Sequence, residues 1–279
     1  MMAIEKTFLI TGASSGLGRA LAEAALADGH RVIGTVRNEA ARADLDALQP
    51  GRSFGRLLDV TETAAAAPLL AEIEHAIGPI DVLVNNAGYG HEGTVEESPI
   101  QDLRRQLEVN VIGAVAMMQA VLPSMRQRRT GHIVNITSMG GIVTFPGLGF
   151  YHGSKFALEG ISEALGKEVR HFGIAVSAVE PGAFRTDWAG RSMVRAERSI
   201  ADYDAVFAPI RERRQENSGK QPGDPAKAAR AILTLVATGT PPAHLLLGQD
   251  ALALVREKLI ALKSEIDTWE RLSLSTDFS

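Results

Sequence analysis

Short apolar runs alternate with longer helical patterns along most of this 279-residue chain. The runs that we interpret as strands are residues 6–11, 31–36, 55–60, 81–86, 131–138, 174–182 and 244–248. They are nearly continuous in apolar residues, which is typical of strands that helices cover on both faces. Strands that alternate with helices are joined by right-handed crossovers into a parallel sheet. The sequence therefore predicts an α/β fold, with a doubly wound parallel sheet between two layers of helices.

Residues 183–222 interrupt this alternation, because they mix charged and aromatic residues and contain no clean strand. Long irregular segments in compact domains are usually lids or linkers. We predict one domain over residues 1–279, with 183–222 as a loop segment over the substrate. The run 211–214 (RERR) within it is interpreted as a solvated helix face rather than a binding patch.

The charge balance, 29 basic against 33 acidic residues with a net charge of −4, argues against nucleic acid as the main partner. The chain has no cysteine, which excludes disulfides, thiolate metal sites and a cysteine nucleophile. Glu5 and Lys6 lie where a signal peptide needs unbroken apolar residues. No run approaches the roughly 18 apolar residues of a membrane span. We therefore expect a cytoplasmic protein with no membrane span.

A glycine-rich turn, TGASSGLG, follows the first strand at residues 11–18. Glycines let backbone amides approach a pyrophosphate closely, and the start of the following helix favours its negative charge. The spacing of Gly12, Gly16 and Gly18 is not the commoner Gly-x-Gly-x-x-Gly. A tight turn with close helix packing remains open as an alternative, although it does not need all three glycines.

A tyrosine and a lysine stand four residues apart in YHGSK, at Tyr151 and Lys155. One helical turn separates them, so both side chains share one helix face. An ammonium group beside a phenol stabilises the phenolate and lowers its pKa from about 10 toward the working range. The pair is therefore a candidate for acid–base chemistry, and a surface pair at a helix start is the alternative.

Four motifs in order, TGASSGLG, NNAG (85–88), YHGSK and PGAFRT (181–186), resemble the short-chain dehydrogenase/reductase family. The resemblance covers roughly residues 5–190 and is to the single-domain branch, most of all to its hydroxysteroid- and retinol-dehydrogenase-like members. It implies a Rossmann-like fold and hydride transfer between a nicotinamide cofactor and an alcohol or carbonyl group.

The resemblance also implies roles for four catalytic residues. Ser138 matches the serine that holds the substrate oxygen, and Tyr151 matches the proton donor and acceptor. Lys155 matches the residue that binds the nicotinamide ribose and lowers the pKa of the tyrosine. Asn110 matches the helix asparagine that holds a water in the proton relay, although such an asparagine can also serve packing alone.

The remaining implied residues contact the cofactor, and no metal-ligand set accompanies them. Asp59 and Val60 match the adenine site, and Pro181, Gly182 and Thr186 match the segment beside the nicotinamide. The others are Gly12, Ser14, Ser15, Gly16, Leu17 and Gly18 in the turn, Asn86, Ala87 and Gly88 in NNAG, and Tyr151 and Lys155 themselves. Asn86 and the Pro181–Gly182 pair could instead be a turn and a strand stop.

Cofactor choice is predicted from the end of the second strand, RVIGTVRN. An NAD-preferring site places an acidic residue there for the ribose 2′-hydroxyl. This chain has Val36 at that position and then Arg37, whose guanidinium can bind a 2′-phosphate. Ser15 could add a hydroxyl donor. We therefore expect NADP(H) to be preferred over NAD(H), with an arginine that stacks on adenine or points to solvent as the alternative.

The function predicted from the sequence is an NADP(H)-dependent oxidoreductase that acts on a secondary alcohol or ketone, with an apolar substrate. A regulator that binds the cofactor without turnover is the alternative, but such proteins lose the tyrosine, lysine or serine, and all three are present. A lyase or epimerase usually has a separate substrate domain. Apolar residues on more than one face of 99–128 and 155–172 predict a homodimer or homotetramer.

Overall fold

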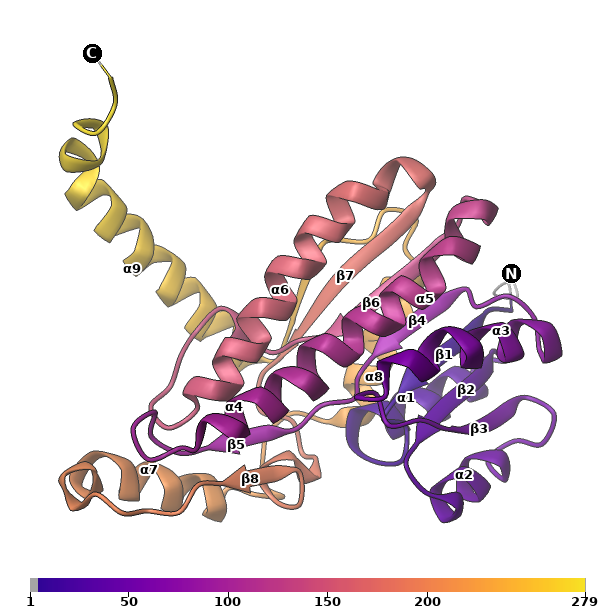
Figure 1. Ribbon diagram of the computed structural model, residues 1–279, viewed down its shortest axis with the longest axis horizontal. Helices are drawn as coiled ribbons and strands as arrows, with labels where there is room; N and C mark the ends of the chain where they lie inside the picture. The colour runs from indigo at the N-terminus through magenta and orange to yellow at the C-terminus, as the bar shows by residue number, and fades with distance from the viewer. Residues whose placement is uncertain (1–4, 279) are drawn as a thin grey trace.

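The computed structural model describes residues 5–278, and its centre is a seven-stranded parallel sheet. The strand order is β3-β2-β1-β4-β6-β7-β9, which is the doubly wound arrangement (Figure 1). The strands are β1 (Thr7–Thr11), β2 (Arg31–Val36), β3 (Ser53–Leu57), β4 (Val82–Asn85), β6 (Gly131–Ile136), β7 (Ile174–Pro181) and β9 (His244–Leu247). Each lies within or overlaps a predicted run, so the predicted fold class is confirmed.

Helices cover both faces of the sheet because successive side chains of each buried strand point to opposite faces. In β1, Phe8 and Ile10 belong to one apolar cluster, whereas Leu9 between them belongs to the other. The first cluster is closed by α1 (Gly16–Ala27), α2 (Glu39–Asp46) and α8 (Pro225–Ala237). The second is closed by α3 (Ala66–Ala76), α5 (Gly113–Arg128) and α6 (Gly149–Val169).

The helix predicted at 99–128 is α4 (Ile100–Leu107), a π-helical turn (Glu108–Ile112) and α5 in one run. Among the described residues, this is the one helix long and apolar enough to cross a membrane by length and composition alone. Here, α5 packs against α3 and the sheet. The apolar residues of α5 pack in the second cluster, which explains its composition. They include Met117, Met118, Val121 and Met125.

The segment 183–222 is more ordered than the sequence suggests. Its strand β8 (Met193–Arg195) pairs in parallel with β5 (Gly90–Glu92), and its helix α7 (Asp204–Glu216) lies beside them (Figure 1). The interpretation of residues 211–214 as a solvated face is wrong for two of the arginines. Arg211 and Arg214 form ion pairs of 3.2 and 2.6 Å with the fully buried Glu92. These contacts hold the segment against the body of the molecule.

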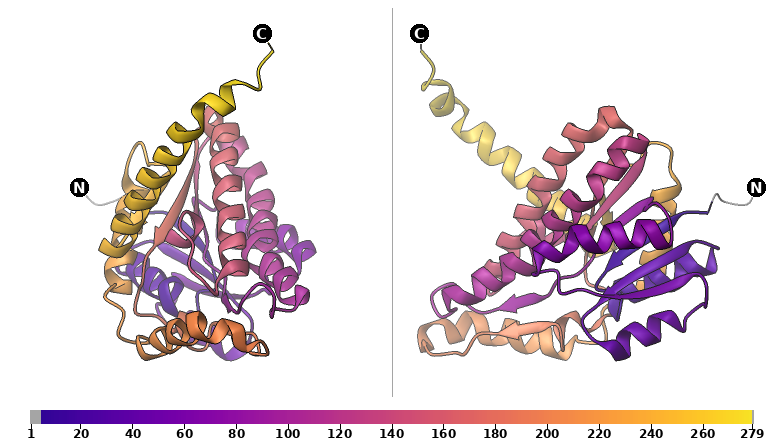
Figure 2. Two further views of the ribbon diagram at one scale, coloured as in Figure 1. Left: turned by 90° about the vertical axis from the view of Figure 1, so that its left-hand side faces the viewer. Right: turned by 45° about the vertical axis from the view of Figure 1, so that its right-hand side comes forward.

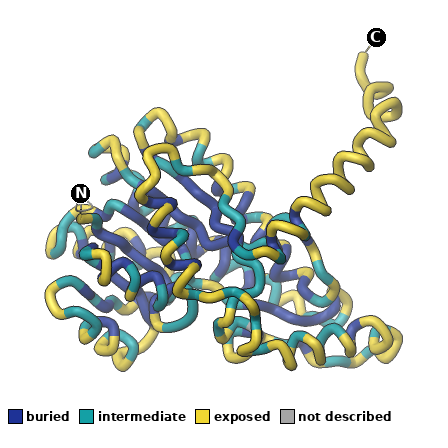
Figure 3. Tube along the Cα trace, turned by 180° about the vertical axis from the view of Figure 1, so that it is seen from behind, coloured by how far each residue is buried: buried dark blue, intermediate teal, exposed yellow. Residues whose placement is uncertain are grey.

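The last helix, α9 (Gln249–Leu274), begins against the sheet and then leaves the body of the molecule (Figure 2). Its buried residues are Ala251 and Val255, in its first two turns. Residues 256–278 are all exposed, as the continuous yellow of this helix shows in Figure 3.

Candidate active site

The glycine-rich turn between β1 and α1 has the backbone that the sequence predicts. Gly12 and Gly16 adopt the left-handed conformation, with φ of +67° and +58°. A side chain at Gly12 would come within 2.9 Å of the Cα of Ala87, and one at Gly18 within 2.7 Å of the carbonyl oxygen of Gly12. Glycine is therefore required at these positions by backbone conformation and by close approach.

The first turn of α1 fits an anionic ligand. Ser15 is the N-cap residue, yet its side chain makes no capping hydrogen bond, and no acidic residue lies in the first turn of this helix. The backbone N–H groups at a helix start need acceptors and favour negative charge. Ser14 is exposed and Leu17 is partly buried against the first apolar cluster. The turn thus fits the pyrophosphate of a dinucleotide.

The NNAG segment is fixed to the end of β1. The side-chain amide of Asn86 donates to the carbonyl oxygens of Thr11 and Gly12 at 2.9 and 3.1 Å. The backbone amides of Asn86 and Ala87 both donate to the hydroxyl of Thr11 at 3.0 Å. A Cβ at Gly88 would lie 3.1 Å from Asn110 and 3.8 Å from the Nζ of Lys155. NNAG therefore connects the turn with the tyrosine–lysine region.

The expected adenosine end of the site lies at the ends of β2 and β3. The Asp59 carboxylate accepts hydrogen bonds from the backbone and hydroxyl of Thr61, and the backbone bond is the largest cause of its lowered pKa. Val60 packs closely on Gly113 at the start of α5. Val36 is buried in the first apolar cluster, so Arg37 is the first side chain beyond β2 that can reach a ligand.

Arg37 is exposed and has no hydrogen bond or ion pair to any described residue. Its charge contributes weakly to the lowered pKa of Asp59. The guanidinium is therefore available for a ligand at the end of β2, because no protein carboxylate holds it.

Ser138 and Tyr151 meet at the carboxyl end of β6. Ser138 begins the short helical turn Met139–Gly141, and its hydroxyl accepts a hydrogen bond of 2.9 Å from Gly140. Tyr151 lies in the first turn of α6 and is 7% exposed. The Ser138 hydroxyl also acts on the Tyr151 phenol as a hydrogen-bonding partner. The predicted catalytic pair is thus close in space, 13 residues apart in the chain.

Burial controls the titration of both Tyr151 and Lys155. Burial raises the pKa of Tyr151 to about 12, and the hydrogen bond with Ser138 opposes that rise. Burial lowers the pKa of Lys155 to about 8. The Lys155 Nζ donates to the carbonyl oxygen of Ile136 at 2.9 Å and lies 5.8 Å from the Tyr151 ring centroid. The two causes of the Tyr151 pKa are thus burial and Ser138, and the lowering of this pKa by Lys155 stays a prediction.

Asn110 is buried in the π-helical turn between α4 and α5, and its side-chain amide is fully engaged. Its Oδ1 accepts from the amide of Tyr89 at 3.1 Å, and its Nδ2 donates to the Tyr89 carbonyl at 3.1 Å and the Ser154 hydroxyl at 3.0 Å. Insertions of this kind in α-helices are frequent at functional sites. Asn110 therefore has a structural role of its own, because it ties α4–α5 to α6.

The segment after β7 returns to the glycine-rich turn. A side chain at Gly16 would lie 3.6 Å from the Cβ of Thr186, so the two motifs face each other. Gly182 lies directly against the carboxylate of Asp250, which also accepts a hydrogen bond of 2.7 Å from Ala183. Pro181 is the last residue of β7. The contact between Gly16 and Thr186 therefore places the segment after β7 beside the glycine-rich turn.

The sequence offers Trp188, Tyr203 and Phe207 as candidates for the lining of a substrate pocket, and one of them belongs to an apolar cluster beside Tyr151. The Trp188 ring lies 5.1 Å from the Tyr151 ring, centroid to centroid. Leu148, Met193 and Phe145 complete the cluster. The aromatic residues of 183–222 were the available signal, but Phe207 packs on Gly147 and Tyr203 is an exposed partner of Glu96. Of these three aromatics, Trp188 is the one that reaches the tyrosine.

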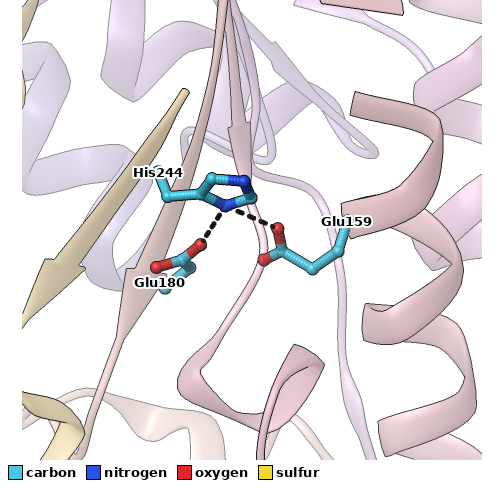
Figure 4. A group of neighbouring side chains, drawn as sticks. All are labelled: Glu159, Glu180 and His244. Atoms are coloured by element: carbon cyan, nitrogen blue, oxygen red, sulfur yellow. Dashed lines mark hydrogen bonds and ion pairs between the residues drawn. The ribbon is translucent and has the colours of Figure 1, made fainter. Parts of the chain in front are cut away.

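A second group of titratable side chains lies one helical turn beyond Lys155, between α6, β7 and β9 (Figure 4). The His244 Nδ1 lies 2.8 Å from a Glu180 carboxylate oxygen and 3.5 Å from one of Glu159. Both glutamates are buried. Burial raises the pKa of Glu159 to about 7 and also raises the pKa of Glu180. The three residues are far apart in the sequence, so spacing alone could not reveal this cluster.

A doubly wound sheet with a glycine-rich turn at β1, and a serine, tyrosine and lysine at β6 and α6, defines a dinucleotide-binding oxidoreductase. Residues 6–195 match the short chain dehydrogenase family, and the chain belongs to it. Oxidoreductase BOA17 of Botryotinia fuckeliana is 37% identical, covering 97% of this chain and 99% of its own length. Retinol dehydrogenase 8 of Homo sapiens is 33% identical, covering 87% and 81%.

Solved structures agree with this assignment. A short-chain dehydrogenase from Streptomyces avermitilis aligns with a TM-score of 0.92 and 43% identity, over 99% of this chain and 100% of that one. A family member from Burkholderia phymatum, solved in complex with NAD, has a TM-score of 0.81 and 28% identity, over 94% and 96%. By contrast, the NADPH-dependent 3-dehydrocapnine reductase of Ornithobacterium rhinotracheale is 34% identical, over 72% and 74%. Relatives therefore differ in cofactor.

Proposed function

We propose that this protein is an NADP(H)-dependent oxidoreductase that interconverts a secondary alcohol and a ketone or related carbonyl, with Tyr151 as general acid and base. The observation that carries the proposal is the meeting of Ser138 and Tyr151 beside the buried ammonium of Lys155. They lie at the same sheet edge as the glycine-rich turn, because the carboxyl ends of parallel strands share one edge. A bound nicotinamide would supply or accept the hydride.

The protonation states suit carbonyl reduction. With a pKa of about 12, Tyr151 carries its proton at neutral pH and can donate it to an oxygen that gains negative charge. With a pKa of about 8, Lys155 is mostly charged at pH 7 and can stabilise the phenolate that remains. The Ser138 hydroxyl positions the substrate oxygen beside the phenol. Asn110 holds α6 against α4–α5 through Ser154.

The substrate in this proposal is apolar around its reacting carbon. Trp188, Leu148 and Met193 gather around Tyr151, and this cluster offers an apolar wall rather than charged groups. Small-molecule sites are mostly apolar, with few polar groups that set orientation.

The preference for NADP(H) in this proposal rests on Arg37. An exposed guanidinium without a protein partner at the end of β2 can bind a 2′-phosphate with paired, charge-assisted hydrogen bonds. Ser15, whose hydroxyl makes no capping bond, is available for the same phosphate. The repulsive carboxylate of an NAD-preferring site is missing here, because the residue at that position is a valine, Val36.

The test is NADPH oxidation by the purified protein against a panel of ketones, aldehydes and quinones. We expect turnover of at least one apolar carbonyl compound. Tight NADPH binding without turnover across the panel would favour the alternative of a non-catalytic NADP(H)-binding regulator. Ser138, Tyr151 and Lys155 are all present and lie close together, which favours a catalytic function over a regulatory one.

We also propose that the chain forms a homo-oligomer through α5 and α6. The side chains of Ile112 and Phe156, on these two helical runs, are 42% and 43% exposed. Such residues on neighbouring helices are suited to pairing across a twofold axis.

A further inference from the structure

The C-terminal helix α9 carries apolar side chains that nothing in the described chain covers. From residue 256 to 274 the helix is exposed on all sides, over a length of roughly 28 Å at 1.5 Å per residue (Figure 3). In proteins, most helical stability comes from packing of an apolar face rather than from the helix propensity of its residues. We therefore expect the exposed apolar side chains of α9 to pack against a surface outside the described chain.

The spacing of the apolar residues indicates what that surface is. Five of the exposed ones, together with the buried Val255, recur at alternating steps of three and four residues, and Ile260, Leu272 and Leu274 lie off this line. We name the regular set the α9 stripe: Leu252, Val255, Leu259, Leu262, Ile266 and Trp269. An average repeat of 3.5 residues is that of a helix that pairs with another helix along a narrow seam. Docking on a lipid surface calls for a broader apolar face with basic residues opposite.

The charges along α9 are complementary to those of a second α9 that runs in the opposite direction. Residues 256–263 contain three basic and one acidic side chain, which gives a net charge of +2. Residues 264–271 contain three acidic and one basic side chain, which gives −2. In an antiparallel pair centred near Ser264, each positive half faces a negative half.

The residues beside the seam distinguish the two orientations. In a heptad with Leu259 and Ile266 at the first position, a parallel pair places Lys258 beside Lys263 of the partner subunit. An antiparallel pair instead places Arg256 beside Glu270 of the partner subunit, twice across the twofold axis. The charges therefore favour the antiparallel orientation.

We propose that α9 forms an antiparallel helix pair with α9 of a second copy of this chain, in which Leu262 packs against Ile266 of the partner subunit. This surface is separate from α5 and α6. If both surfaces are used, the assembly is a tetramer.

The first test is sedimentation velocity of the full chain at micromolar concentrations. Leu262→Glu combined with Ile266→Glu should halve the particle mass and raise the dissociation constant by about a hundredfold or more. The control combines Ala261→Glu with Thr268→Glu, on the flank of the same exposed helix, and should leave the mass unchanged. A monomeric wild-type protein, or a stripe variant with wild-type mass, would overturn the proposal. NADPH binding shows that each variant is folded.

The second test is a charge exchange that does not disturb the stripe. Arg256→Glu should weaken association by about tenfold, because it faces Glu270 of the partner subunit. Adding Glu270→Arg should restore it. Failure of the second change to rescue the first overturns the antiparallel pair. Binding to vesicles of phosphatidylserine and phosphatidylcholine tests a lipid surface as the alternative partner. A monomeric protein that binds these vesicles through the α9 stripe would show that α9 docks on lipid and would overturn the helix pair.

Discussion

At the residue scale, Tyr151 and Lys155 have pKa values that are set mainly by burial rather than by each other. Burial dominates the pKa of Tyr151, whereas Lys155 donates to the Ile136 carbonyl and has its own pKa lowered by burial. In the proposed reaction, the lysine acts on the phenolate formed during proton transfer rather than on the resting phenol. The two residues should therefore have separable kinetic effects.

Tyr151→Phe should lower kcat by about 10²- to 10⁴-fold, because the proton donor is lost while the ring and its packing remain. The dissociation constant for NADPH should change little. Lys155→Ala should impair both turnover and cofactor binding. Steady-state kinetics and fluorescence titration with NADPH measure these effects. The control is Tyr203→Phe, an exposed tyrosine paired with Glu96, which should keep wild-type kinetics. A Tyr151→Phe enzyme with more than a few per cent of the wild-type rate contradicts the assignment.

The motifs allowed the candidate site to be outlined from the sequence, because three of them follow strands whose ends converge in a parallel sheet and YHGSK lies at the start of α6. Trp188 could not be selected in this way. It reaches Tyr151 through the path of the chain after β7, and Phe207, an equally plausible candidate, packs instead on Gly147. The sequence also did not show that Val36 is buried, and this burial determines which residue to substitute in a test of cofactor preference.

An acidic residue at Val36 would bury a carboxylate in the core, so Arg37 is the better position to change. Wild-type enzyme should favour NADPH over NADH by about one to two orders of magnitude in kcat/KM, since each charge-assisted hydrogen bond contributes roughly 1.5–3 kcal/mol. Arg37→Ala should remove most of this preference, and Arg37→Asp should reverse it. Arg126→Ala, at the far end of α5, is the control. Equal efficiency with both cofactors in the wild type would show that Arg37 does not bind the phosphate.

At the element scale, the segment 183–222 owes its order to long-range ion pairs. The buried Glu92 at the end of β5 contacts Arg195 of β8 and Arg211 and Arg214 of α7. The main strands could be predicted because they are continuous apolar runs. β5 and β8 could not, since each has three residues and much of its stability comes from charges more than a hundred positions apart. Sequence spacing contains no information on such pairs.

Glu92→Gln should loosen this segment, because three guanidinium groups would lose their buried counter-charge. Removing one partner of a buried ion pair typically costs about 3–5 kcal/mol. We expect the substrate KM to rise about tenfold and limited proteolysis to cut within 183–222, with NADPH affinity unchanged. Glu212→Gln changes an exposed residue of the same helix and serves as the control. Unaltered proteolysis in Glu92→Gln would mean that the ion pairs do not hold the segment.

At the scale of the whole molecule, the fold concentrates titratable groups between the sheet and α6. Glu159 and Glu180 are buried beside the half-exposed His244, on three elements that meet only in the folded state. The pKa values of both glutamates and of the histidine are raised above their ordinary values, with burial as the largest cause for the glutamates. For His244, burial lowers the pKa, but the hydrogen bond to Glu180 and the charges of the neighbouring glutamates together raise it by more.

The contribution of this cluster to stability should therefore fall as the pH rises from about 5 to 8, whereas His132, whose pKa burial lowers to about 4, contributes with the opposite sign. A group whose pKa is higher in the folded state binds more protons there, so its contribution is present below the unfolded pKa and lost through the folded one. For Glu159 that window runs from the ordinary glutamate pKa of 4.5 to about 7, and His244 acts with the same sign. The loss is on the order of 2–3 kcal/mol for Glu159, or several degrees in Tm. Glu159→Gln resembles the protonated residue and should remove this loss, so that the Tm of the variant relative to the wild type rises with pH, whereas Glu168→Gln, at an exposed position of the same helix, should show no such trend. A difference in Tm between Glu159→Gln and the wild type that stays constant over this range would contradict the buried, proton-retaining state of the cluster.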